Sequence, residues 1–178
     1  QLMSYHSNYR DLSSQGLSEN ELTRDSVIQE ISRETGEVIF EWNSFDYLDL
    51  SDCLNHRFPD DYAHINSISL DIDNNIIASF RGCSMVLKIN RISGDVMWST
   101  GGSNPTLKII NDPYNEFCGQ HTANVTPDGY LTIFDNGGHC NGDRESVNGK
   151  FSRALKYEID IKNSRLIFNS QYLLNNSK

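Results

Sequence analysis

Short runs of alternating apolar and polar residues, each closed by a tight turn, fill the middle of the chain. From His64 to Gly102 the residues read HINSISLDIDNNIIASFRGCSMVLKINRISGDVMWSTGG. Turn residues at 73–75 and 93–95 separate runs that favour strands. The predicted strands span residues 65–72, 76–80, 85–90 and 96–99. Four antiparallel strands in about forty residues are typical of one blade of a β-propeller.

A partial copy of this pattern precedes the central unit. VIQEISRETGEVIFEW, residues 27–42, lies over the outer hairpin MVLKINRISGDVMWS, residues 85–99, and this comparison sets Trp42 against Trp98. The match predicts an outer hairpin of the same kind, with a short strand before it. The strands expected here span residues 2–5, 27–31 and 37–42.

A further complete unit follows the central one. HTANVTPDGYLTIFDNG, residues 121–137, matches the first two central strands, and SRALKYEIDIKNSRLIFNS, residues 152–170, supplies an outer hairpin. The connections at 43–63 and 103–119 contain proline and lack a strand period, so they are predicted to be irregular. A short helical turn is expected near 48–54 in the first of them.

These repeats predict an all-β fold in which residues 1–178 are part of a single β-propeller domain. The expected divisions are the outer strands of one blade at 1–42, a second blade at 64–102 and a third at 121–170. A propeller closes on itself with four to eight blades. We therefore expect about two and a half blades, either of a larger ring or of a ring that another chain completes. The beginning of the protein is expected to be missing because Gln1 is not a methionine. The open strand edges would favour a homodimer.

Composition narrows the possible partners. The formal net charge of −9 argues against nucleic acid or an anionic membrane surface, because both would be repelled. An anionic small substrate stays possible, since one local cation can dominate a pocket. No apolar run approaches 18 residues, so no membrane span is predicted.

The four cysteines form no C-x-x-C pair, which argues against a zinc ribbon or a thioredoxin-type site. They are either small buried or free thiols, or they form one or two disulfides of an exported protein. Cys118 and Cys140 flank the same predicted blade in loops, and they are the favoured pair.

Two histidines stand at the start of innermost strands, which line the channel of a propeller. His64 immediately precedes one such strand, and His121 holds the same place in the next blade, 57 residues later. Either histidine by itself is more typical of a hydrogen-bonded residue at a blade corner. Two in register, with an arginine at the end of the antiparallel second strand, favour a functional site. The residues that this periodicity gathers at one channel mouth are His64, Asn66, Arg81, His121, Asp135 and Asn136.

The motifs DYAHINSI, SFRGCS, GQHTA and LTIFDNG, in this order, resemble the arylsulfotransferase (aryl-sulfate sulfotransferase) family over about residues 2–173. The resemblance implies a six-bladed propeller and a transferase that needs no nucleotide sulfate donor. Such an enzyme moves a sulfuryl group from a phenolic sulfate ester to a phenol acceptor through a covalent sulfohistidine. It also implies export to the periplasm or the cell exterior, and a disulfide near the nucleophile, which would suit Cys118.

The resemblance assigns unequal roles to the candidate residues. His121 matches the histidine that carries the sulfuryl group, His64 matches the channel histidine, and Arg81 matches the sulfate-binding arginine. Asn66, Asp135 and Asn136 are expected to contact substrate. A further histidine of the family's site belongs to an earlier blade. Neither a cofactor nor a metal is expected, because the two histidines lack carboxylate or thiolate partners at ligand spacing.

Two other functions remain open from the sequence. A propeller can serve as a non-catalytic binding module, in which case both histidines are corner residues. A quinoprotein-like dehydrogenase is a weaker alternative, because the repeated tryptophan pattern and the cofactor ligands of that class are missing.

Overall fold

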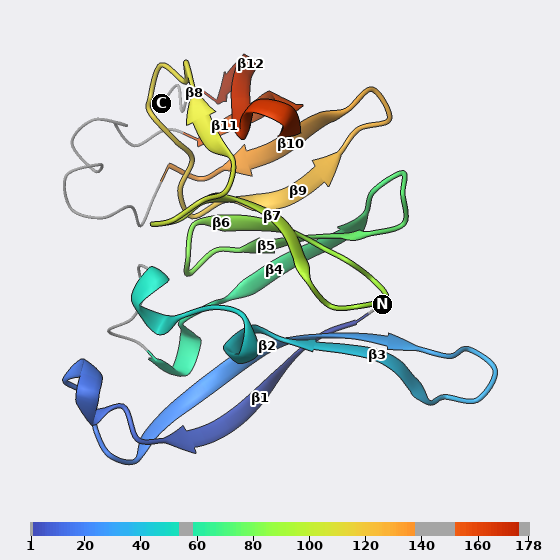
Figure 1. The fold of residues 1–178 in the computed structure, drawn as a ribbon. Coiled ribbons are helices and arrows are strands. Elements are labelled where there is room, and N and C mark those ends of the chain that lie inside the picture. The colour runs from blue at the N-terminus through green and yellow to red at the C-terminus, as the bar shows by residue number, and fades with distance from the viewer. Residues whose placement is uncertain (1, 54–58, 138–151, 175–178) are drawn as a thin grey trace.

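Three largely antiparallel sheets stack one on another in chain order along the long axis of the molecule (Figure 1). The structure, a computed structural model, describes residues 2–53, 59–137 and 152–174. All regular elements in these residues are strands or single 3₁₀ turns. The expected all-β class is therefore confirmed.

The first sheet has the order β1-β2-β3, formed by β1 (Leu2–Arg10), β2 (Glu21–Ile31) and β3 (Val38–Asn43). The first two strands are longer than predicted, because polar pairs lie inside the ladder. The guanidinium of Arg10 lies 2.7 Å from the carboxylate of Asp25, whose side chain is fully buried. Charged residues that are buried as pairs break the apolar-polar alternation on which the prediction depended.

The second sheet has the order β4-β5-β6-β7 that the pattern predicted. Its strands are β4 (Ile65–Leu70), β5 (Ile76–Phe80), β6 (Met85–Ile89) and β7 (Val96–Gly101). Every residue of β5 is buried, because this sheet is covered on both faces. Ile76, Ala78 and Phe80 join the core shared with the first sheet. Ile77 joins the core shared with the third sheet.

The third sheet has the order β8-β12-β11-β10-β9. Its strands are β8 (Lys108–Ile110), β9 (His121–Val125), β10 (Tyr130–Asp135), β11 (Ser152–Asp160) and β12 (Arg165–Leu174). The four strands β9 to β12 lie where the sequence predicted them. Strand β8 corrects the expectation of an irregular connection at 103–119, and it pairs in parallel with β12. Three residues are too few to show a period.

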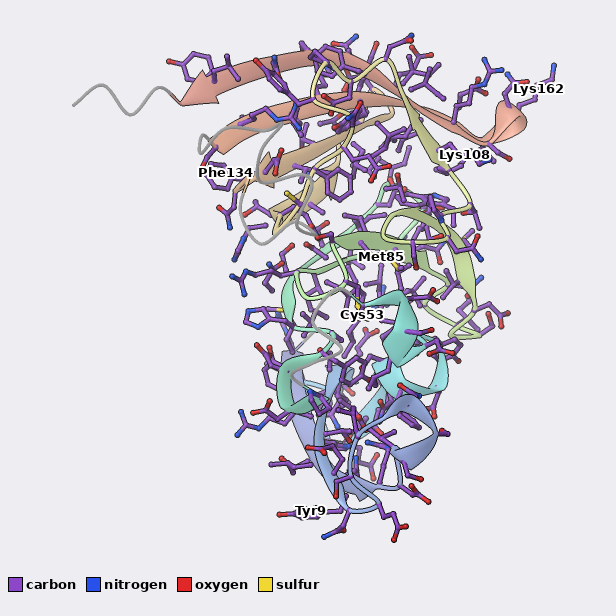
Figure 2. The ribbon with its side chains drawn as sticks, turned by 90° about the vertical axis from the view of Figure 1, so that its left-hand side faces the viewer. Tyr9, Cys53, Met85, Lys108, Phe134 and Lys162 are labelled. Atoms are coloured by element: carbon purple, nitrogen blue, oxygen red, sulfur yellow. A yellow bond between two sulfur atoms is a disulfide. The ribbon has the colours of Figure 1, made fainter. Side chains whose placement is uncertain are left out.

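The connection between the first two sheets contains three 3₁₀ turns, η2 (Ser44–Asp46), η3 (Leu50–Asp52) and η4 (Pro59–Asp61). The helical turn expected near 48–54 is η3. A disulfide joins Cys53, after η3, to Cys83, after β5. Cys53 lies near the middle of the molecule in Figure 2. Of the favoured pair, Cys118 is disulfide-bonded, and Cys140 lies outside the described residues.

The ladder register corrects the predicted equivalence of the two tryptophans. Trp42 pairs with Ile28 on β2, whereas Trp98 pairs with Lys88 on β6. When the turn glycines at 36 and 94 are aligned, Trp98 corresponds to Phe40. Trp42 instead faces the second sheet, where its indole Nε1 donates a hydrogen bond of 3.1 Å to the carbonyl oxygen of Gly94. The tryptophan therefore joins two sheets, and it is not a repeated element of each.

A buried charge cluster stabilises the third sheet. Arg153 on β11 is 1% exposed, and its guanidinium contacts the carboxylates of Asp112 and Asp135 at 2.8 and 2.7 Å. Tyr157 donates its hydroxyl hydrogen to Asp112. Burial and the charge of Asp112 raise the pKa of the Tyr157 phenol well above its ordinary value, so it stays a donor. Asp112 thereby anchors the loop after β8 to the centre of the sheet.

We predict that Arg153→Met lowers the free energy of unfolding by about 3–5 kcal/mol, because two buried carboxylates would lose their cation. Urea denaturation at neutral pH measures this change. Lys156→Met is the matched control, since Lys156 lies on the same strand but forms an exposed ion pair with Asp128. The control should change stability by less than about 1 kcal/mol. A comparable loss in both variants would contradict the assigned role of Arg153.

Candidate active site

His64 is held at the start of β4 by its backbone and by its ring. Its φ of 47° is a left-handed conformation, and its carbonyl oxygen accepts a hydrogen bond of 2.9 Å from the backbone N–H of Arg81. The ring nitrogen Nδ1 lies 2.7 Å from Oδ2 of Asp61, the last residue of η4. The side chain is 30% exposed. A carboxylate therefore orients a histidine that solvent can reach.

Arg81 follows β5 directly and lies across from His64. The neighbouring Gly82 donates its backbone N–H to the carbonyl oxygen of Ala63, which continues the ladder past the end of the strand. Within the described ranges, the half-buried guanidinium of Arg81 has neither a hydrogen bond nor an ion pair. In a chain with an excess of acidic residues, such a cation is available to bind an anion.

His121 is the first residue of β9, and a neighbouring amide holds its ring. Nδ1 of His121 lies 2.9 Å from Nδ2 of Asn136, the residue after β10. The same Nδ2 donates to the carbonyl oxygen of Gly119 at 2.7 Å. The amide of Asn136 therefore orients the ring of His121, and the expected contact of Asn136 with substrate stays a prediction.

Gln120 joins the strands that carry the two histidines, and sequence reasoning overlooked it. Its side chain is fully buried between the second and third sheets. The amide Nε2 lies 3.1–3.2 Å from Oγ of Ser79 and the carbonyl oxygens of Phe80 and Met85. Its backbone carbonyl oxygen accepts a hydrogen bond of 2.7 Å from Nδ2 of Asn66. The residue before His121 is thus hydrogen-bonded to β4, β5 and β6 of the second sheet.

Strands β4 and β9 lie side by side along this contact. Oγ of Ser67 accepts from the backbone N–H of Ala123, and Oγ of Ser69 donates to the carbonyl oxygen of the same residue. The third sheet packs on the second (Figure 1), and β9 contacts β4 and β5. The structure therefore brings β4 and β9 together, and the convergence of His64 and His121 at one channel mouth stays a prediction.

The two histidines are not at strictly equivalent positions. His64 stands opposite Arg81, whereas His121 pairs with Phe134, which corresponds to Phe80. The positions are offset by one residue. Each inner strand has a register shift in its first residues, between Ile65 and Ser67 on β4 and just after His121 on β9. Such bulges redirect side chains, and they are common beside active sites.

The side chain of Asp135 is buried in the third sheet, next to the segments that carry His121 and Asn136. The residue is 1% exposed, and Arg153 donates to its Oδ2. Its Oδ1 accepts from the backbone N–H groups of Cys118 and Gly137, which flank the segments that carry His121 and Asn136. In this structure Asp135 contacts Arg153 and backbone N–H groups, and its expected contact with substrate stays a prediction.

A family model described as Arylsulfotransferase (ASST) matches residues 4–172, nearly the whole chain. The chain belongs to the arylsulfotransferase family. Membership supports an arylsulfotransferase-type function in general and small phenolic substrates. A search among curated proteins gave no match.

Two negative findings concern the described ranges of this arylsulfotransferase-family chain. In residues 2–53, 59–137 and 152–174, no helix has the length and apolar character to cross a membrane. Within the same residues, no three histidine, cysteine or acidic side chains form a group that could hold a metal ion.

We predict that Gln120→Met lowers the free energy of unfolding by about 2 kcal/mol, because three buried acceptors lose their shared donor. Chemical denaturation measures the loss. Gln29→Met is the matched control, because the amide of Gln29 makes only an exposed hydrogen bond to Glu41. That variant should stay within about 0.5 kcal/mol of the wild type. An unchanged stability of Gln120→Met would show that this amide does not hold the sheets together.

Proposed function

We propose that this chain carries part of an active site that moves a sulfuryl group from a phenolic sulfate ester to a phenol acceptor, with His121 as the covalent carrier. The observation that supports this most is the contact of Gln120 with the strand ends of the second sheet. It places the segment of His121 against β4 and β5, which lead to His64 and Arg81. Family membership supports the same reaction class.

The residue types suit sulfuryl transfer. The reaction resembles phosphoryl transfer, in which the group is displaced in line and its charge is spread over three equatorial oxygens. An imidazole nitrogen is a good nucleophile near neutral pH and can hold the group as sulfohistidine. The guanidinium of Arg81 offers a planar fork of donors to the sulfate oxygens and cannot lose its proton. Clamping of this kind is worth about 3–4 kcal/mol in a transition state.

His64 is the proposed acid and base of the two half-reactions. It protonates the leaving phenolate and later accepts the proton of the incoming phenol, which leads to ping-pong kinetics. Asn66 is proposed to orient a sulfate oxygen. One hydrogen of its amide nitrogen is donated to the carbonyl oxygen of Gln120, so the second hydrogen is the one proposed to reach the sulfate. Its Oδ1 only accepts hydrogen bonds and takes no part in this contact.

The three sheets are proposed to be consecutive blades of a propeller whose remaining blades come from the rest of the protein or from a second copy. Four-stranded antiparallel sheets are the units of that architecture, and the second sheet has this form, while the first has three strands and the third has five. The Cys53–Cys83 disulfide supports export to the periplasm or the cell exterior, because disulfides persist in oxidising compartments. The alternative function, a non-catalytic binding propeller, would leave the polar contacts of both histidines as structural bonds.

Replacing the proposed carrier tests the assignment directly. In the full-length protein, His121→Ala should abolish transfer from a nitrophenyl sulfate donor to a phenol, and no ³⁵S-labelled enzyme should form. His6→Ala is the control, since His6 is an exposed residue of β1 and should leave turnover unchanged. Turnover at the wild-type rate in His121→Ala would rule out this residue as the carrier.

A second substitution tests the clamp. Arg81→Lys keeps the positive charge but loses the planar fork, and we expect activity to fall by more than about tenfold, or about 1.4 kcal/mol in the barrier. Steady-state kinetics with the same donor measure the fall. Arg33→Lys, in an exposed turn, is the matched control. A loss below about threefold would mean that Arg81 does not grip the sulfate with two bonds.

A further inference from the structure

The two histidines of the site face different kinds of hydrogen-bond partner. The partner of Nδ1 in His64 is the carboxylate of Asp61, at 2.7 Å. An ionised carboxylate only accepts hydrogen bonds. The proton of a neutral His64 ring therefore lies on Nδ1, and Nε2 carries the lone pair. Within the described ranges, nothing else binds this ring.

The partner of Nδ1 in His121 is the side-chain amide of Asn136. The contact of the same amide with the carbonyl oxygen of Gly119 identifies which amide atom faces the ring. One atom of that amide lies both 2.7 Å from the Gly119 oxygen and 2.9 Å from Nδ1 of His121. A carbonyl oxygen only accepts, so this atom is the NH₂ nitrogen, Nδ2. Nδ1 of His121 is consequently the acceptor, and the proton of the neutral ring lies on Nε2.

We propose that Asp61 and Asn136 are positioning residues that set opposite tautomers in the two histidines. His121 then presents an Nε2–H, and His64 presents a bare Nε2 that can take that proton. The inference rests on the proposed role of His121 as the sulfuryl carrier. It adds Asp61, which the sequence motifs did not single out, and it gives Asn136 a role other than substrate contact.

The transfer step balances with this arrangement. The bond between sulfur and the phenolic oxygen breaks, and a bond between sulfur and Nε2 of His121 forms. An Nε2–H has no free lone pair, so the proton of His121 must leave as the bond between sulfur and nitrogen forms. The bare Nε2 of His64 is the proposed base for this proton, and His64 then passes it to the phenolate oxygen. The products are a neutral phenol and a sulfohistidine, and no other reactant is needed. The second half-reaction with an acceptor phenol runs in reverse.

Each partner suits the state that the step creates. Sulfohistidine with the group on Nε2 has an unprotonated Nδ1, and the amide of Asn136 already donates to that atom. The carboxylate of Asp61 stabilises the imidazolium that forms briefly on His64. This is the role of the aspartate beside the histidine in a nucleophile–histidine–carboxylate triad. The negative charge of Asp61 also acts on Tyr5. Burial raises the pKa of the Tyr5 phenol, and the charge of Asp61 raises it further.

Nitrogen NMR of the protein with ¹⁵N-labelled histidine rings tests the proposal without substrate. The wild type should show an unprotonated Nε2 in His64 and an unprotonated Nδ1 in His121. Asp61→Asn should shift His64 toward the Nε2–H tautomer, because the new amide can donate to Nδ1. Asn136→Asp should move the proton of His121 to Nδ1, because a carboxylate accepts. Asp60→Asn, in the same 3₁₀ turn, is the matched control and should change neither ring.

Kinetics of the full-length protein separate this inference from the proposed function. Asp61→Asn should lower kcat by roughly 10²-fold at nearly constant KM, and Asp60→Asn should not. Either ring in the opposite tautomer, or no response to its variant, would overturn the inference even if ³⁵S-labelled His121 forms. Absence of label in the wild type would overturn the proposed function instead, because the tautomers are measured without it. Amide spectra of each variant show whether it is folded.

Discussion

The buried amide of Gln120 is the constraint on which the arrangement of the candidate site depends. Its nitrogen is shared among three acceptors at the ends of β5 and β6, and its backbone carbonyl receives the amide of Asn66. A buried polar group without its partners costs far more than a surface one, so a displaced third sheet would leave several groups unsatisfied. The position of His121 relative to the second sheet is therefore determined by hydrogen bonds, and apolar packing alone could not specify it.

A second set of polar contacts, centred on Asp135, fixes the loop that holds the ring of His121. Asp135 binds Arg153 on one side and two backbone N–H groups on the other, at Cys118 and Gly137. The adjacent Asn136 is thereby held where its amide meets both Gly119 and the ring of His121. Asp135 and Asn136, which are consecutive residues of the LTIFDNG motif, thus have different structural roles. The buried aspartate orders the loop, and the asparagine orients the histidine.

The sequence was most informative where one strand packs against known neighbours. Strand β5 was predicted to the residue because Ile76 to Phe80 is a largely apolar run between two turns. The length of β1 was not predictable, because Arg10 is paired with Asp25 inside the ladder and the pair hides the alternation. Asp61 and Gln120 stand inside the motifs DYAHINSI and GQHTA, but the motifs alone gave neither residue a role. The partners of Gln120 are distant in the chain, and the contact of Asp61 with His64 depends on a loop conformation.

The coverage of the sheets bears on the architecture independently of the site. Both faces of the second sheet are buried, by one core on each side. The first sheet, in contrast, leaves Leu2, Met3 and Ile39 exposed, and the third leaves Tyr172 exposed beside Phe134 in a shallow hollow. Phe134 and Tyr172 share the face of the third sheet that points away from the second, because both pair with Ala154. An exposed apolar face of this kind is what a stack of blades presents where it would meet a further blade. The same coverage that buries β5 on two sides would thus be repeated at each end of the stack in a closed propeller.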